Sequence, residues 1–459
     1  MASFALAACL ITTPVLAEQN LKPLINSGEK LLEFDWPALQ IGTGEYEEGP
    51  TGVTVFKFGK KSLGAVDVRG GAPGTVNTDY LRLGYEKPEL DAVVFSGGSW
   101  YGLESTTAVA TGLKDDNIRN GYWDNLALTV GAIIYDFGDR RLNEVYPDKK
   151  LAQAALRAVR PGVFPLGSQG AGRFARSGGF FGCGSYSGQG GAFRQIGDIK
   201  IAAFTVVNAG GVITDRDGSI VTCFKDSTWP ESTKTADLFA GVPHSRKLGW
   251  DGVPQGADNK NTTISLVVTN QKMTYAELQR LAVQVHTSMG RGLQPFATVN
   301  DGDVLYAVST GEVGDDVKAG GMSASDLGAG ISTGDLGAIA SEVMWDAILA
   351  SVPEQPKKLI PAEDLKLSED NLAKMTGKYV FSPFVTVEIT HKDGQLYAQA
   401  VGDRPAFAIG KEKPVKLSAV SENLFTVADR YPLALQFDEA SGLTINPGHW
   451  EQKSIKSSK

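Results

Sequence analysis

The chain has 459 residues, of which 42% are hydrophobic and 21% are charged, the usage of a folded globular protein. Its 52 acidic residues outnumber its 44 basic residues, which gives a formal net charge of −8 at pH 7. Because the sequence has no Lys/Arg-rich run, this acidic balance speaks against nucleic-acid binding. Three cysteines and four scattered histidines, without a CxxC pair or an HExxH motif, do not suggest a metal site.

Residues 1–17, MASFALAACLITTPVLA, form an uncharged apolar leader. The run is shorter than the ~20 residues that a membrane span needs. It resembles the apolar part of a secretory signal cut after Ala17, although the usual basic start is missing. We therefore expect a signal peptide and a periplasmic or secreted protein. Two alternatives are a lipoprotein box ending at Cys9 and a disordered leader. After export Cys183 and Cys223 could pair, but the sequence does not place them in contact.

The first half of the chain alternates apolar, β-branched runs with glycine-rich turns and helical patterns. Such runs are typical of buried strands, and we expect strands at 53–56, 92–95, 132–135 and 202–207. Residues 225–261 are polar and rich in Gly and Pro, which indicates a surface loop. A strong strand pattern follows at 262–269. Thr274 and Glu277 then form a capping box that begins a helix, and a second helix is expected at 335–351.

The last part of the chain changes character after a linker at residues 353–367. Val385, Val387 and Ile389 alternate with polar residues, and Asp393-Gly394 is a hairpin turn signal. Residues 368–459 are therefore predicted to form a small antiparallel β-barrel or sandwich. We expect no chemistry there. This domain could cover an active-site mouth, mediate association or stabilise the protein.

The junction between the polar loop and the strand is Asn261-Thr262-Thr263. A cut before Thr262 would free an α-amine with a pKa of about 8 beside the hydroxyl of the same residue. That amine can take the hydroxyl proton, as in N-terminal-nucleophile hydrolases. Threonines at a strand start are common, however, and the spacing alone leaves an ordinary strand start open.

Ten sequence blocks in order carry a resemblance to a known family. They are 46–52 (YEEGPTG), 66–72 (VDVRGGA), 134–137 (IYDF), 146–149 (YPDK), 188–190 (GQG), 261–265 (NTTIS), 284–286 (QVH), 294–296 (QPF), 301–303 (DGD) and 335–347 (DLGAIASEVMWDA). Over roughly 32–350 the chain resembles the N-terminal-nucleophile amidases that comprise D-aminopeptidase/esterases and β-aminopeptidases. Within them it is most similar to the nylon-oligomer (6-aminohexanoate-oligomer) endo-hydrolases.

This resemblance implies a four-layer αββα sandwich, an α/β (α+β) fold, over residues 18–352. The precursor would cut itself into chains 18–261 and 262–459 that stay associated. The family also implies a homo-oligomer, a tetramer by resemblance, and neither a metal nor an organic cofactor.

The resemblance assigns Thr262 as the nucleophile and Asn261–Thr262 as the self-cleaved bond. Asp301 and Asp303 correspond to paired acids that hold the new α-ammonium or orient the threonine hydroxyl. From the residues alone, Asp-Gly-Asp before a strand could equally be a solvated hairpin turn.

Three further roles are implied. Tyr135 and Asn208 match donors to the oxyanion of the tetrahedral intermediate, although a core tyrosine and a turn asparagine are the alternatives. Lys149 matches a family lysine near the tyrosine, or it is a solvated residue at a helix start. The family also has an active-site lysine that this chain lacks between Lys150 and Lys200. Arg173 or Arg176 could replace its charge, but an arginine cannot act as a base at neutral pH.

The turn Gly97-Gly98-Ser99-Trp100 lies between a strand and a helix pattern. Its backbone N–H groups could face the substrate, or the turn could serve only packing. Altogether the sequence predicts an amide hydrolase that forms an acyl-threonine intermediate on linear amide oligomers. The alternatives are an aminopeptidase for β- or D-amino acyl amides, an acyltransferase, and a non-catalytic secreted binding protein.

Overall fold

The computed structural model describes residues 21–82, 85–138, 140–224, 232–242, 261–314, 330–427, 431, 433–438 and 442–456. The expected signal peptide, the Cys9 alternative and most of the expected loop at 225–261 lie outside these residues. Among the described helices, none is long and apolar enough to cross a membrane.

An 11-stranded sheet forms the centre of the larger domain. Its longest strand, β4 (Thr51–Val68), pairs over its first part with β3 and β6 and over its last part with β17. β4 therefore connects two halves of the sheet. One half contains β3 (Leu39–Tyr46), β6 (Glu89–Ser96) and β7 (Thr129–Ile133), and the other contains β12 (Gln189–Ile196), β13 (Ile199–Asn208), β15 (Thr262–Gln271) and β17 (Val304–Val313).

The two halves of the sheet pack face to face through an aromatic and aliphatic core. Phe56, Phe95 and Phe204 are buried in it, together with Leu266 and Tyr306. The hydroxyl of Tyr306 on β17 donates a 2.9 Å hydrogen bond to the carbonyl of Gly131 on β7, which joins the halves directly. Apolar residues on both faces of these strands explain their continuous hydrophobic runs in the sequence.

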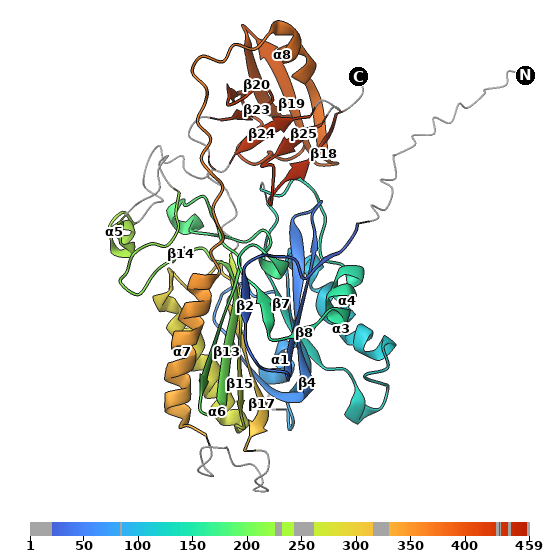
Figure 1. The fold of residues 1–459 in the computed structure, drawn as a ribbon, viewed down its shortest axis with the longest axis vertical. Coiled ribbons are helices and arrows are strands. Elements are labelled where there is room, and N and C mark those ends of the chain that lie inside the picture. The colour runs from blue at the N-terminus through green and yellow to red at the C-terminus, as the bar shows by residue number, and fades with distance from the viewer. Residues whose placement is uncertain are drawn as a thin grey trace, which may run out of the picture.

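Helices cover the outer face of each half (Figure 1). α3 (Glu104–Asp115) and α4 (Lys149–Arg157) pack on one side, and α6 (Tyr275–Ser288) and α7 (Thr333–Ala350) pack on the other. Thr274 caps α6 in the expected capping box with Glu277. The order helix, sheet, sheet, helix confirms the predicted four-layer αββα sandwich.

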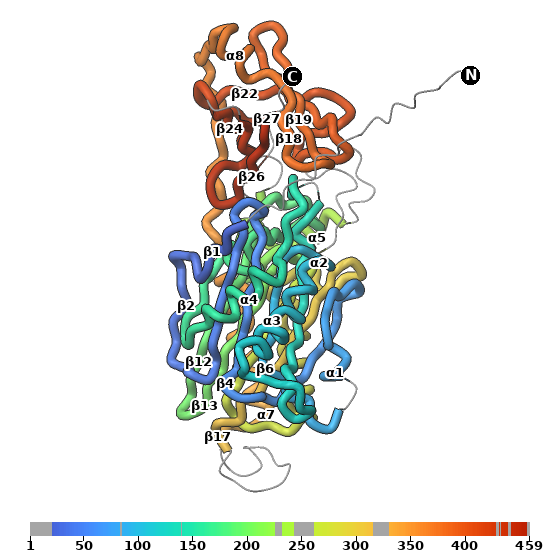
Figure 2. Tube along the Cα trace, turned by 90° about the vertical axis from the view of Figure 1, so that its right-hand side faces the viewer, coloured from blue at the N-terminus to red at the C-terminus, as the bar shows by residue number. Residues whose placement is uncertain are grey.

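The C-terminal region forms two five-stranded antiparallel sheets, which confirms the small β domain. Figures 1 and 2 show it at one end of the sandwich. Its strands are β18 (Gly377–Ser382), β19 (Val385–Lys392), β20 (Gln395–Ala400), β21 (Val415–Lys416) and β27 (Ile455–Lys456) in one sheet, and β22 (Ser418–Ala419), β23 (Leu424–Thr426), β24 (Ala434–Phe437), β25 (Leu443–Ile445) and β26 (Gln452–Lys453) in the other. α8 (Glu369–Met375) precedes them.

Shorter elements complete the described chain. They are β1 (Leu24–Ile25), β2 (Leu31–Glu33), β5 (Thr75–Val76), α1 (Thr78–Arg82), α2 (Ser99–Gly102), η1 (Trp123–Asn125), β8 (Arg160–Pro161), β9 (Val163–Pro165), η2 (Gly170–Gly172), β10 (Arg176–Ser177), η3 (Gly179–Phe181), β11 (Ser185–Tyr186), β14 (Val212–Ile213), α5 (Thr235–Phe239), η5 (Met289–Arg291) and β16 (Leu293–Gln294). The expected strand at 132–135 begins and ends earlier, as β7, so that Tyr135 lies just beyond the strand.

Cys183 and Cys223 form a disulfide, with their Cα atoms 4.7 Å apart. Both cysteines pack with Phe181 and Val212 in a small apolar cluster. The disulfide answers the question that the sequence left open, and it ties the turn after η3 to the segment that ends at Phe224.

Candidate active site

The ends of three neighbouring strands bring the predicted nucleophile and its partners together. Thr262 begins β15 and pairs in register with Asn208, the last residue of the antiparallel strand β13. β17 runs parallel to β15, and the residues before it place Asp301 beside Asn261. Thr262 is buried, at 4% exposure. Asn208, Asn261, Thr262 and Asp301, which are separated by up to 93 positions in the chain, therefore lie at one edge of the sheet.

At the Asn261–Thr262 junction, the threonine hydroxyl contacts the carbonyl of the preceding residue. Thr262 Oγ1 donates a 2.6 Å hydrogen bond to the carbonyl oxygen of Asn261. The backbone N–H of Gly302 donates to the same oxygen at 2.8 Å. The Gly302 N–H polarises this carbonyl, and the Thr262 hydroxyl lies in contact with it. Sequence reasoning missed the role of Gly302, because a main-chain donor has no side-chain signature.

Gly302 can approach this closely because it lacks a side chain. A Cβ atom at this position would lie 2.8 Å from Thr262 Oγ1 and 2.8 Å from the carbonyl oxygen of Ala72. The glycine in the Asp301-Gly302-Asp303 motif thus has a steric reason.

Asp303 is a buried carboxyl next to the junction. Its Oδ1 accepts the Thr263 N–H at 2.7 Å, and its Oδ2 accepts the Ala297 N–H at 3.0 Å. Burial, and then the nearby Asp301, raise the pKa of Asp303 to about 7. This carboxyl can therefore exchange a proton near neutral pH.

Asp301 is buried as well. Its Oδ2 accepts the backbone N–H of Thr298 at 3.1 Å and the hydroxyl of Thr298 at 2.6 Å, and its Oδ1 accepts the Gly210 N–H at 3.4 Å. Only 2% of Asp301 and 1% of Asp303 is exposed. The two aspartates do not form a solvated hairpin turn, which removes that alternative.

Asn208 and Tyr135 also meet. The side-chain Nδ2 of Asn208 donates to the carbonyl oxygen of Tyr135 at 3.1 Å. The Asn208 Oδ1 accepts the N–H of Arg176 and Nη2 of Arg140, both at 3.1 Å. Arg140 Nη2 also donates to the Tyr135 carbonyl at 2.6 Å. Asn208 is fully buried and is oriented by hydrogen bonds at both ends of its amide.

Arg140 is a second residue that sequence reasoning missed. It follows the family block 134–137 by only a few positions, and an arginine there was the available signal. Arg173 and Arg176, the two expected substitutes for the family lysine, have other partners. Arg173 pairs with the buried Glu45 at 2.5 Å. The Arg176 side chain lies over aromatic rings, and only its backbone N–H contacts Asn208.

Three backbone N–H groups of the turn Gly97–Trp100 bond to the protein itself. The N–H groups of Gly97, Gly98 and Ser99 donate to Gly52 O, Asp136 Oδ1 and Ile134 O at 2.9, 2.9 and 3.0 Å. For these three N–H groups the expectation of a substrate contact is corrected, because they hold the turn onto the protein itself. The side chains of Trp100 and Tyr101 are 72% and 65% exposed and remain available for a substrate.

Lys149 is an exposed residue at the start of α4. Its neighbour Asp148 caps that helix by accepting the Leu151 N–H at 2.9 Å. Among the described hydrogen bonds and ion pairs, none joins Lys149 to Thr262, Asn208 or Tyr135. These contacts agree with the alternative of a solvated helix start.

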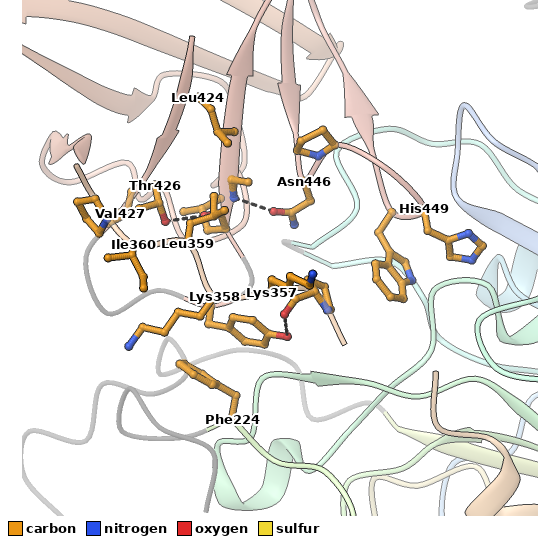
Figure 3. A pocket seen from close by; sticks show the side chains of 17 residues that line it. Phe224, Lys357, Lys358, Leu359, Ile360, Leu424, Thr426, Val427, Asn446 and His449 are labelled. Carbon is orange, nitrogen blue, oxygen red and sulfur yellow. Dashed lines mark hydrogen bonds between the residues drawn. The ribbon is translucent and has the colours of Figure 1, made fainter. Parts of the chain in front are cut away.

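No group of three or more His, Cys, Asp or Glu side chains within the described ranges could hold a metal ion. A cavity of about 540 Å³ lies between the linker and the C-terminal domain (Figure 3). Phe224, Ile360 and Trp450 are among its lining residues. This cavity belongs to the C-terminal domain and its linker rather than to the edge of the sheet that contains Thr262.

The chain is similar to known proteins over most of its length. Residues 34–355 match the sequence profile of peptidase family S58. The chain is 41% identical over 331 residues to the 6-aminohexanoate-oligomer endohydrolase of Paenarthrobacter ureafaciens. This alignment covers 72% of this chain and 88% of that protein. It is 42% identical over 332 residues to the enzyme of the same name from Agromyces sp. (strain KY5R), with the same two shares.

The solved structure of a Burkholderia sp. β-aminopeptidase is similar to this one, with a TM-score of 0.49 and 17% sequence identity. The match covers 71% of this chain and 88% of that chain. The C-terminal β domain lies beyond the residues that the family profile matches. The profile covers more than half of the sequence, and the relatives are aligned over most of their own length. The chain therefore belongs to peptidase family S58 and is a hydrolytic enzyme.

Proposed function

We propose that this protein is a self-cleaving, N-terminal-threonine hydrolase of linear amide oligomers of the 6-aminohexanoate type. The observation that carries the proposal is the hydrogen bond between Thr262 Oγ1 and the Asn261 carbonyl, with the Gly302 N–H on the same oxygen. A hydroxyl and an oxyanion donor thus meet at one peptide bond.

Maturation proceeds by an acyl shift. Thr262 Oγ1 attacks the Asn261 carbonyl carbon, the hydroxyl proton passes to the Thr262 nitrogen, and the peptide C–N bond breaks to leave an ester. Water then hydrolyses the ester, which releases the Asn261 carboxylate and frees the Thr262 amine. The Gly302 N–H stabilises the oxyanion in both steps.

Substrate hydrolysis uses the new amine as the general base. It takes the proton of the Thr262 hydroxyl, which attacks the substrate amide and forms an acyl-threonine that water then hydrolyses. Asp301 and Asp303 hold the ammonium form. The Asn208 Nδ2 carries two hydrogens, and its bond to the Tyr135 carbonyl uses one of them. We assign the second hydrogen, with the Tyr135 hydroxyl, to the substrate oxyanion.

The substrate class rests on the relatives, two of which are named 6-aminohexanoate-oligomer endohydrolase. An apolar methylene chain suits the exposed rings of Trp100 and Tyr101. Export is part of the proposal and is supported by the apolar leader and by the Cys183–Cys223 disulfide, a bond typical of oxidising compartments. A homo-oligomer stays a prediction from family resemblance.

The test uses two sets of linear 6-aminohexanoate oligomers, one with a free amino end and one with an acetylated amino end. Chromatography measures the products formed from each set. We expect cleavage of both, and none by Thr262→Ala. Thr269→Ala is the matched control, because it removes another buried hydroxyl from β15 and should leave cleavage intact.

Other outcomes favour the alternatives. Cleavage of the free oligomers alone would indicate an aminopeptidase. Transfer to an added amine in preference to water would indicate an acyltransferase. Binding without turnover in the wild type would indicate a binding protein.

A further inference from the structure

The loop that follows Tyr135 is held by the C-terminal domain. Leu142 lies in the hydrophobic core of that domain, although it belongs to the sandwich by sequence. The Leu142 N–H donates to Gln452 Oε1 at 2.6 Å, and Gln452 Nε2 donates to the Arg140 carbonyl at 2.7 Å. Gln452 on β26 is 1% exposed. One buried amide therefore clamps both sides of residue 141.

The other end of Arg140 reaches the active site. Its guanidinium donates to the Tyr135 carbonyl and to Asn208 Oδ1, at 2.6 and 3.1 Å. Gln452 is thus linked to Asn208 through Arg140, whose main-chain carbonyl bonds Gln452 and whose side chain bonds Asn208.

A second contact from the same domain supports Asn208. The Arg176 N–H donates to Asn208 Oδ1, and the Arg176 guanidinium carbon lies 5.4 Å from the Tyr186 ring and 5.6 Å from the Phe407 ring. Phe407 belongs to the C-terminal domain. Trp450 of that domain stacks on Tyr186 with ring centroids 3.9 Å apart. Both residues that donate to Asn208 Oδ1 therefore also contact the C-terminal domain, Arg140 through Gln452 and Arg176 through Phe407.

We propose that the C-terminal β domain is a positioning element of the active site, and that Gln452 is the residue through which it orients Arg140, Asn208 and Tyr135. This inference rests on the proposed function, since it assumes that Asn208 and Tyr135 act on the substrate oxyanion. Gln452 itself does not touch the substrate. It restrains the loop, so that the Asn208 side chain keeps a single rotamer. The Nδ2 hydrogens then keep pointing in one direction.

The physical reason is the cost of losing a buried clamp. Without the Gln452 amide, the buried Leu142 N–H and the Arg140 carbonyl lose these two hydrogen bonds, and the loop is no longer restrained by Gln452. Arg140 then no longer holds Asn208 Oδ1 in place. A misplaced oxyanion donor lowers kcat more than it raises KM, because it acts on the transition state.

The test uses the full-length chain with Gln452→Met, which keeps the side-chain length and removes both hydrogen bonds. Gln271→Met is the matched control. Gln271 is fully buried, donates to Ile331 O at 2.9 Å and accepts the Ile331 N–H at 3.0 Å. It clamps a loop at the opposite end of β15, roughly 30 Å from Thr262 at about 3.3 Å per residue.

We expect both variants to be destabilised, and both to be processed into two chains, since Gly302 and not Asn208 faces the Asn261 carbonyl. Gln452→Met should lower kcat about tenfold with KM within about twofold, whereas Gln271→Met should keep kcat within about twofold. In an Arg140→Ala background, Gln452→Met should cause no further loss of kcat, because the two residues act in series.

A kcat for Gln452→Met within twofold of the wild type would overturn the inference. So would equal losses in the two glutamine variants, or additive losses with Arg140→Ala. If the wild-type protein itself neither cuts its chain nor hydrolyses the oligomers, the proposed function fails. If the wild type does both and Gln452→Met matches it, only the positioning role fails.

Discussion

The backbone N–H of Gly302 and the carbonyl of Asn261 are joined by a 2.8 Å hydrogen bond. The same carbonyl accepts the hydroxyl of Thr262 at 2.6 Å. The loop that precedes β17 therefore supplies a hydrogen-bond donor that polarises the carbonyl of the peptide bond before β15. This pairing links the Asp301-Gly302-Asp303 motif to the chemistry of the junction, in addition to its two carboxylates.

Replacing Gly302 with alanine should slow self-cleavage. The added Cβ would lie 2.8 Å from Thr262 Oγ1, so the hydroxyl or the loop must shift. Loss of a well-placed oxyanion donor costs about 3 kcal/mol in the transition state, so we expect cleavage to slow by about a hundredfold. A time course of precursor and product by gel electrophoresis measures it.

Gly121→Ala is the control for that variant, because a Cβ at Gly121 meets no atom within 4 Å. It should mature at the wild-type rate. Normal maturation of Gly302→Ala would show that neither the position of the hydroxyl nor the Gly302 donor matters.

The raised pKa of Asp303 predicts a pH-dependent stability. Its folded pKa, about 7, exceeds its ordinary value of 3.8, so the folded state binds the proton more tightly than the unfolded state. The contribution of Asp303 to stability is present below about pH 4 and is lost as the pH rises through about 7. Thermal unfolding of the uncut Thr262→Ala precursor between pH 4 and pH 8 measures it.

In that background Asp303→Asn should weaken the fall in melting temperature across this pH range. The asparagine also loses one acceptor for the Thr263 or Ala297 N–H, so the pH slope, and not the absolute melting temperature, is the relevant quantity. Identical slopes for the two proteins would contradict the assignment of the titrating group.

Trp100→Ala should raise KM for amide oligomers about fivefold and leave kcat nearly unchanged. The indole is 72% exposed, and covering part of it with a methylene chain is worth about 1 kcal/mol. Trp123→Ala is the control, since Trp123 is 73% exposed on a different segment. Equal KM values for the two variants would remove Trp100 from the binding surface.

Much of the site could be predicted from the sequence, because the family blocks contain Tyr135, Thr262, Asp301 and Asp303 in order. The sequence does not show which atom forms a hydrogen bond with each backbone N–H or carbonyl group. The N–H groups of Gly97 and Gly98 are consumed by Gly52 and Asp136, residues 45 and 38 positions away, which no local pattern reveals.

The same limit applies to the C-terminal domain. Its strands could be predicted from the alternation of apolar and polar residues and from a turn signal. We expected this domain to carry no chemistry. Its contacts with Arg140 and Arg176 depend on how the two domains dock, since Gln452 and Arg140 are 312 positions apart. Docking contacts of this kind leave no periodic signal in either domain.

The Cys183–Cys223 disulfide should be present in protein isolated from an oxidising compartment. It closes a segment with a sequence separation of 40, for which the chain-entropy relation gives a stabilisation of about 4 kcal/mol. Peptide mapping with and without reductant identifies the linked peptides, and denaturant unfolding of Cys183→Ser/Cys223→Ser measures the free energy of unfolding. Recovery of both cysteines as free thiols without reductant would contradict the pairing.

The most direct test of the central claim is an intact-mass spectrum of the purified wild-type protein beside Thr262→Ala. If Thr262 cuts the chain as proposed, the wild type yields two species, one ending at Asn261 and one comprising residues 262–459, while the variant stays whole. A single uncut wild-type species, or an equally cut variant, would contradict the self-activated threonine mechanism.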